Sequence, residues 1–171
     1  MNRTKRGFTL IELMVVIAII GILVTIGIFA FQSSQKKSRD SRRKADLNQV
    51  SKALEMYNND QNKYPGVDAS GQIAGCGAAY TDTCPWGSLF GYTSDTTNVI
   101  YMIKLPKDPT STWYYTYEQV GKGYRLYARL ENLEDQSIPT SEPKQYAKTC
   151  GTGVNCNYVL TSSNTTEPTV Q

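Results

Sequence analysis

The sequence predicts an α+β fold in which one long N-terminal helix packs on a small antiparallel sheet. Neither glycine nor proline occurs between residues 28 and 64, so nothing local interrupts a helix there. Apolar residues recur at helical spacing within residues 47–57, which predicts a buried helical face. Residues 124–130 instead alternate between two sets of side chains, and this period of two is typical of a strand with one buried face.

The first half of the predicted helix is apolar on all sides. Residues 13–31 contain no charged side chain and one polar side chain, Thr25. At about 1.5 Å per residue, this stretch has close to the roughly 30 Å length of a bilayer core. We therefore expect residues 8–31 to form the membrane-embedded half of a helix that begins near Phe8.

The second half of the helix, residues 32–60, is amphipathic. Its apolar side chains lie at helical spacing: Leu47, Val50, Leu54 and Tyr57. Asn58–Asp60 supply turn chemistry and Pro65 forbids continuation, so we expect the helix to end near Asn59. An amphipathic helix of this kind can pack on a globular domain, here the head expected at residues 61–163.

The head is expected to contain an antiparallel hairpin. Residues 113–118 and 124–131 are predicted strands, and Gly121 and Gly123 suit the turn between them. In the second strand, one face is expected to be buried and the other to face water. The side chains of the two faces are Tyr124, Leu126, Ala128 and Leu130 on one, and Arg125, Tyr127 and Arg129 on the other. Residues 164–171, NTTEPTVQ, are expected to form a disordered tail.

Composition argues against an enzyme. The chain contains no histidine, which removes the usual general base of Ser/His and Cys/His catalysis and the commonest zinc ligand. No motif arranges the remaining carboxylates, lysines or tyrosines for catalysis. We expect no catalytic residues and no cofactor, and a membrane-anchored binding module is a remote alternative.

Charge is unevenly distributed along the chain. Residues 32–59 carry seven basic and three acidic side chains, whereas residues 60–171 carry eight and eleven. A basic stem and a mildly acidic head can attract each other between copies of the chain. The basic cluster from Lys36 to Lys44 lacks the interleaved aromatic side chains of a single-strand groove, so we expect solvated or lipid-contacting charges and no direct nucleic-acid binding.

The four cysteines occur as two close pairs, which allow three disulfide pairings. Loop closure favours Cys76 with Cys84 and Cys150 with Cys156, because short loops cost the least entropy. A zinc site made of all four thiolates is the alternative, although these spacings are wider than those of structural zinc sites. A membrane anchor ahead of the cysteines favours an oxidising compartment and therefore disulfides.

The N-terminus resembles the processing motif of type IV prepilins and pseudopilins over Lys5-Arg6-Gly7-Phe8-Thr9-Leu10-Ile11-Glu12. An ordinary signal peptide fits less well, since its apolar core is shorter and ends in small residues. The resemblance implies a leader peptide at residues 1–7, cleaved between Gly7 and Phe8 by a prepilin peptidase. It also implies N-methylation of the new Phe8 amine.

A plain membrane anchor would leave Glu12 unexplained, because a carboxylate at the edge of an apolar span is costly. In the family that the motif resembles, an acid at this place pairs with the N-terminal amine of a neighbouring subunit. The resemblance thus implies that Glu12, with Thr9 in the same motif, serves assembly into a helical homopolymer. The partners implied are other copies of the chain, the inner membrane and a pilus or secretion assembly machinery.

A second resemblance covers Leu105 to Pro109 and the tyrosine-rich stretch up to Tyr127, which is similar to major pseudopilins of type II secretion and to small-headed pilins. It implies a head of three or four antiparallel strands against the helix, a type IV pilin-like fold. Those pseudopilins hold calcium in the loop that follows, and here Glu131, Glu134 and Asp135 are weak calcium candidates beside the reading of a solvated acidic loop.

The resemblance implies a structural subunit of a type IV pilus, which serves adhesion, twitching motility or DNA uptake. The Cys150–Cys156 loop favours this over the alternative, a pseudopilin of a type II secretion-like system. The precursor is expected to cross the cytoplasmic membrane once with its head outside, and then to enter an extracellular pilus or an envelope pseudopilus. Six basic residues between 36 and 44 argue for the opposite orientation, but both leader cleavage and disulfides require the head outside.

Overall fold

The computed structural model describes residues 7–94 and 98–170, without the side chains of Ile26, Phe29 and Ala30. The chain divides into two compact units, one extending to Ser38 and the other comprising Arg39–Gln171. The leader expected at residues 1–7 lies outside the described residues except for Gly7.

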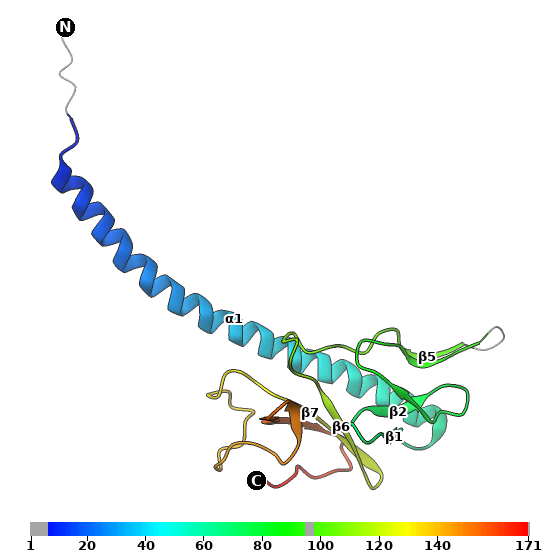
Figure 1. Cartoon of the computed structure of the whole chain (residues 1–171). Helices are drawn as coiled ribbons and strands as arrows, with labels where there is room; N and C mark the ends of the chain where they lie inside the picture. The colour runs from blue at the N-terminus through cyan, green and yellow to red at the C-terminus, as the bar shows by residue number, and fades with distance from the viewer. Residues whose placement is uncertain (1–6, 95–97, 171) are drawn as a thin grey trace. The chain divides into compact units, whose positions relative to one another are not determined.

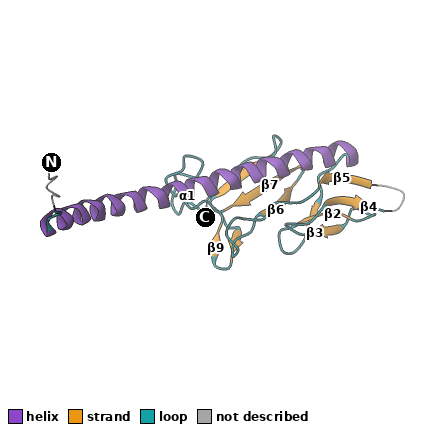
Figure 2. Ribbon diagram, turned by 90° about the horizontal axis from the view of Figure 1, so that it is seen from above, coloured by secondary structure: helices purple, strands orange, loops and turns teal. Residues whose placement is uncertain are grey.

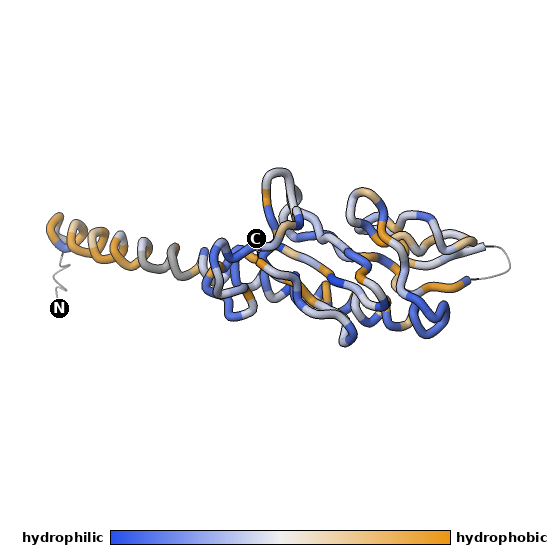
Figure 3. Tube along the Cα trace, turned by 90° about the horizontal axis from the view of Figure 1, so that it is seen from below, coloured by the Kyte–Doolittle hydropathy of each residue, from blue (hydrophilic) through white to orange (hydrophobic). Residues whose placement is uncertain are grey.

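The helix α1 extends from Leu10 to Gln61 (Figure 1), which confirms the long helix to within two residues at each end. Asn62 follows it with φ of 53°, a left-handed conformation that commonly closes helices, and Pro65 prevents any return to helix. The part of α1 in the first unit is strongly apolar near its start (Figure 3). Among the residues whose side chains are described, no helix is both long and apolar enough to cross a membrane.

The second unit contains short antiparallel strands. They are β1 (Gly66–Val67), β2 (Ile73–Cys76), β3 (Asp82–Cys84), β4 (Phe90–Thr93), β5 (Asn98–Met102), β6 (Thr116–Val120), β7 (Gly123–Ala128), β8 (Thr149–Gly151), β9 (Val154–Asn155) and β10 (Tyr158–Thr161). In the described residues they form sheets ordered β1-β2-β3 and β10-β7-β6 and the pairs β4-β5 and β8-β9. The α+β class is confirmed, with the strands divided among several small sheets instead of one.

The predicted hairpin is β6–β7, which lies beside α1 (Figure 2). Val120 pairs with Gly123, so Gly121 and Lys122 form the turn, and Gly121 adopts a φ of 57° that suits glycine. The first strand was expected from residue 113 but begins at Thr116. Residues before Thr116 turn instead toward the C-terminal part of the chain, where the Tyr114 amide donates to the carbonyl of Cys150 at 2.9 Å.

The main core lies between α1 and the sheets. The predicted face of α1 is buried completely: Leu47, Val50, Leu54 and Tyr57. The Tyr57 ring stacks on Phe90 with centroids 5.7 Å apart and meets Tyr101 edge-on at 5.2 Å. These aromatic contacts join the helix to β4 and β5, and the β7 side chains Tyr124, Leu126 and Ala128 complete the same core.

The second face of β7 was expected to be wet, and this prediction is wrong. Tyr127 on that face is 1% exposed and packs in a second cluster with Tyr146, Val159 and the Cys150–Cys156 pair. Tyr146 and the Cys150–Cys156 disulfide, from the segment between β7 and β10, cover this face, while β10 extends the sheet along the edge of β7.

The last residues carry no helix or strand between 162 and 170, yet they contact the head. The Arg125 guanidinium donates from Nε to the carbonyl of Thr166 at 3.0 Å, and Val170 packs beside the second cluster. The disorder expected of residues 164–171 stays a prediction, and these contacts describe how the segment lies when it is ordered.

Candidate functional site

The N-terminal motif forms a helix cap at the start of α1. Thr9 precedes the first helical residue, and its amide donates to Glu12 Oε2 at 2.8 Å. The Thr9 hydroxyl donates to the same oxygen at 2.6 Å, and the Glu12 amide donates back to that hydroxyl at 3.3 Å. This reciprocal arrangement is a capping box, which satisfies amides that the helix leaves without partners.

The structure therefore brings together Thr9 and Glu12, both expected to act in assembly. Glu12 forms no ion pair with any residue that the structure describes. Gly7 and Phe8 precede the cap outside any helix and are exposed, so the backbone between them is open to a processing enzyme. A single carboxylate thus lies at the end of the helix beside the bond where the resemblance places cleavage.

The helix surface that follows Glu12 is apolar and lacks cover within the described chain. Every large apolar side chain between Leu10 and Val24 is 44–76% exposed. Monomeric soluble proteins rarely expose a continuous apolar surface of this length, and such surfaces mark contacts with lipid or with other proteins. The apolar helix surface of the first unit therefore requires contact with lipid or with similar helices.

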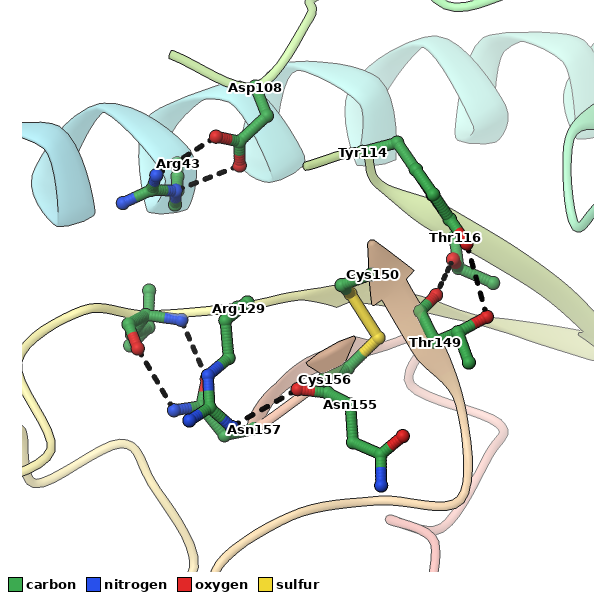
Figure 4. The surroundings of a disulfide bond; sticks show 11 residues. Arg43, Asp108, Tyr114, Thr116, Arg129, Thr149, Cys150, Asn155, Cys156 and Asn157 are labelled. Atoms are coloured by element: carbon green, nitrogen blue, oxygen red, sulfur yellow. Dashed lines mark hydrogen bonds and ion pairs between the residues drawn. A yellow bond between two sulfur atoms is a disulfide. The ribbon is translucent and has the colours of Figure 1, made fainter. Parts of the chain in front are cut away.

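A buried cluster of charges joins α1 to two loops of the second unit. Its centre is Arg43, which is 0% exposed. The guanidinium donates from Nε and Nη2 to the two oxygens of Asp108 at 2.8 and 2.9 Å (Figure 4). Nη1 donates to Asp40 and Glu131, both at 2.8 Å, and Nη2 also donates to Thr110 at 2.9 Å.

Two further cations lie beside this cluster. Arg39 donates from Nε to Glu131 at 2.7 Å, and Lys44 Nζ lies 2.6 Å from Asp135 Oδ1. The hydrogen bonds from Arg39, together with those from Arg43 and against the effect of burial, lower the pKa of Glu131 to about 2. Glu131 is therefore ionised throughout the physiological pH range.

These contacts correct the expectation of solvated charges for three of the six basic residues between 36 and 44, whereas Lys36, Lys37 and Arg42 are exposed as expected. Arg43 is buried and Arg39 and Lys44 are paired, because Asp108 and the 131–135 loop bring carboxylates to this turn of α1. Sequence reasoning missed Arg43, Asp40 and Asp108 as a set. The one local signal was the spacing of three between Asp40 and Arg43, which places them on the same helix face.

The calcium candidates do not fit a metal. Glu131 and Asp135 are occupied by Arg39, Arg43 and Lys44, and Glu134 is exposed outside this network. The described residues contain no group of three or more His, Cys, Asp or Glu side chains arranged to hold a metal ion.

The cysteines form two disulfides, Cys76–Cys84 with Cα atoms 5.5 Å apart and Cys150–Cys156 at 5.1 Å. These are the pairs favoured by loop closure, and with all four sulfurs so used none is left for the alternative zinc site. The second disulfide closes the β8–β9 loop and is part of the second cluster (Figure 4), and next to it the Thr116 hydroxyl donates to the carbonyl of Thr149 at 2.6 Å.

Comparison with known proteins indicates the family to which this chain is related. The family model described as "Prokaryotic N-terminal methylation motif" matches residues 2–28. The type II secretion system core protein G of Klebsiella michiganensis is 31% identical over 141 residues, which cover 82% of this chain and 91% of that protein. The protein of the same name from Pectobacterium carotovorum subsp. carotovorum is 28% identical over 138 residues, 81% of each chain.

A pilin is also similar, over a shorter stretch. The type IV major pilin protein PilA of Myxococcus xanthus is 43% identical over 63 residues, which cover 37% of this chain and 29% of that protein. No solved structure matches the chain significantly. The matched methylation motif, the long helix followed by small antiparallel sheets, and relatives that extend over most of the chain agree with one another. The chain belongs to the family of type IV pilins and type II secretion pseudopilins.

Proposed function

We propose that this chain is the precursor of a structural filament subunit. A prepilin peptidase removes residues 1–7, Phe8 becomes the methylated N-terminus, and the mature chains polymerise through the first half of α1. The observation that carries this proposal is the apolar helix surface from Leu10 to Val24, exposed on all sides and preceded by the matched methylation motif.

Glu12 gives the polymer its register. Two charges that are each costly in apolar surroundings become acceptable when they pair at close range. Only one axial stagger between neighbouring helices places the Phe8 amine of one copy beside Glu12 of another. The capping box holds the Glu12 carboxylate at the helix end before assembly, so the side chain exchanges an intramolecular cap for an intermolecular ion pair.

Before assembly, the same helix surface requires an apolar phase. We place the precursor in the cytoplasmic membrane as a single-pass protein, with residues 8–31 in lipid and the head outside. The two disulfides support this orientation, because they form and persist in oxidising compartments. The partners are the peptidase on the cytoplasmic side and an assembly machinery that extracts the subunit from the membrane.

Among filaments, we propose a type IV pilus that serves adhesion, twitching motility or DNA uptake. Support comes from the Cys150–Cys156 loop, which together with the C-terminal segment covers the outer face of the β10-β7-β6 sheet. A pseudopilus of a type II secretion-like system is the second candidate. It is favoured by the extent of the relatives named core protein G, which match more than four fifths of the chain.

The test is the mass of the native protein together with a single substitution. Intact mass should correspond to a chain beginning at methylated Phe8, and a retained leader would refute processing. Glu12→Ala should leave cleavage and membrane insertion intact and abolish filaments, while the matched control Thr25→Ala removes a hydroxyl that bonds within its own helix. Normal filaments from the Glu12 variant would contradict the proposed register.

Imaging separates the two filaments. Long fibres that shear from the cell surface and contain this chain by mass identification are expected for a pilus. Expressed, processed chain without surface fibres would exclude the pilus and leave the secretion pseudopilus.

A further inference from the structure

We propose that the head of this chain is closed by its own side-chain cations and binds no calcium in the 131–135 loop. Arg43, assisted by Arg39 and Lys44, occupies the role that a structural metal ion takes in a loop rich in carboxylates. This inference concerns the stability of the subunit and does not depend on which filament the subunit builds.

Every N–H donor of the Arg43 side chain is used, just as the coordination positions of a bound metal ion are filled. A guanidinium has five N–H donors in a fixed plane. All five are used here, one at Nε, two at Nη1 and two at Nη2, and the acceptors are Asp40, Asp108, Thr110 and Glu131. The Trp113 ring lies against the guanidinium at 4.8 Å from its centroid and excludes water from that side.

The acceptors come from distant parts of the chain. Asp40 and Arg43 lie on α1, Asp108 and Thr110 lie on the loop before β6, and Glu131 follows β7. Asp40 also accepts from the amides of Glu131 and Asn132 at 2.9 and 2.8 Å. The loop backbone is therefore bound to a helix carboxylate through its N–H groups, which are donors and cannot serve as ligands for a cation.

A calcium ion would have to displace these cations. Calcium takes six to eight oxygen ligands, supplied mainly by carboxylates and carbonyls. The Glu131 oxygens accept from Arg39 and Arg43, and Asp135 Oδ1 accepts from Lys44. A divalent ion placed among three positive side chains would be repelled at close range.

The part of this arrangement that α1 contributes is compact. Arg39, Asp40, Arg43 and Lys44 occupy little more than one turn of α1, so the helix alone fixes the three cations and one carboxylate relative to one another. The Asp135 side chain completes the closure by accepting from the Ser137 amide at 2.9 Å while it binds Lys44.

The first experiment measures thermal unfolding of the full mature chain in detergent, after treatment with a chelator. An extracellular calcium module with a Kd of about 10⁻³ M would be about nine-tenths occupied in ~10 mM calcium chloride. Occupancy of that kind would raise the unfolding midpoint by about 3 °C or more. We expect a shift below about 1 °C relative to an equal concentration of magnesium chloride, which controls for ionic strength. A calcium-specific rise would overturn the proposal.

The second experiment asks whether Arg43 holds the loop. Hydrogen exchange of the Glu131 and Asn132 amides should accelerate at least tenfold in Arg43→Met, with or without calcium. The matched control is Arg42→Met, which removes an exposed arginine from the neighbouring position and should leave exchange unchanged. Equal exchange in the two variants, or recovery of protection by calcium, would refute the inference.

A third variant covers the case in which Arg43→Met does not fold. Lys44→Gln keeps Arg43 and removes only the pair with Asp135. Exchange at the Ser137 amide should then accelerate about threefold or more. A partly exposed ion pair contributes a stabilising free energy of roughly one to two times RT, which is enough for a change of this size. Unchanged exchange in this variant would show that the lysine does not close the loop.

Discussion

Acid should weaken the head through Glu131, and the effect can be isolated with one variant. Arg39 and Arg43 lower the pKa of this carboxyl from 4.5 to about 2. A group whose pKa is lower in the folded protein contributes stability above its unfolded pKa. That contribution is lost as the pH falls from about 4.5 toward about 2, where the folded protein also takes up the proton.

The size of the effect follows from the shift. Each pKa unit corresponds to about 1.4 kcal/mol, so the shift of Glu131 gives about 3 kcal/mol of stability at neutral pH. Glu131 is only partly buried and its partner Arg39 is 36% exposed, so solvent screening reduces the contribution and about 3 kcal/mol is its upper value. A domain of this size has a total stability of about 5–15 kcal/mol, so the loss is a substantial fraction.

Other carboxyl groups titrate over the same range. Against the effect of burial, Lys44 lowers the pKa of Asp135 and Lys148 lowers that of Glu118, so both add to acid destabilisation. Burial raises the pKa of Asp46, which acts in the opposite direction. The comparison with a Gln variant removes these shared contributions.

The assay is urea unfolding, followed by circular dichroism, of the wild type and Glu131→Gln from pH ~7 to pH ~2. The difference in unfolding free energy between them should decrease by about 1–3 kcal/mol across this range, mostly below pH ~4.5. Parallel stability curves would refute the reasoning, because they would mean that Glu131 has the same pKa in the folded and unfolded chains.

Three further predictions concern the core, the C-terminal disulfide and the helix cap. Leu54→Ala removes a fully buried side chain and should cost about 2–5 kcal/mol in urea unfolding, whereas Met56→Ala on the exposed face should change it by less than about 0.5 kcal/mol. The double variant Cys150→Ser/Cys156→Ser should lose about 2 kcal/mol and expose Tyr127 to faster iodide quenching; unchanged quenching would contradict the described packing. Thr9→Ala should weaken the cap by about 1 kcal/mol and reduce filament yield, Thr9→Ser should restore both, and equal yields would separate the cap from assembly.

The helix could be predicted from sequence because its determinants are local. The spacing of Leu47, Val50, Leu54 and Tyr57 identifies the buried face, and Pro65 limits how far the helix can extend toward the C-terminus. The motif at Thr9 and Glu12 is similarly contained within four residues, so both its capping geometry and its family resemblance can be read from a short segment.

The buried charge cluster could not be predicted because its partners are distant in sequence. Arg43 meets Asp108 and Glu131, which are 65 and 88 positions away. A run of basic residues looks solvated in isolation, and only the fold brings the carboxylates that make burial of an arginine tolerable. The same reason explains the covered face of β7, since Tyr127 is buried by the segment that contains Tyr146 and Val159.

The β10-β7-β6 sheet is completed by β10, which follows all the other described strands in the sequence. A chain that stops before Tyr158 lacks β10 and leaves one edge of β7 unpaired, and an unpaired strand edge promotes sheet-to-sheet aggregation. Truncated chains therefore expose a strand edge that is paired in the full-length chain. Proteases and chaperones that recognise such edges can remove incomplete chains before they join others.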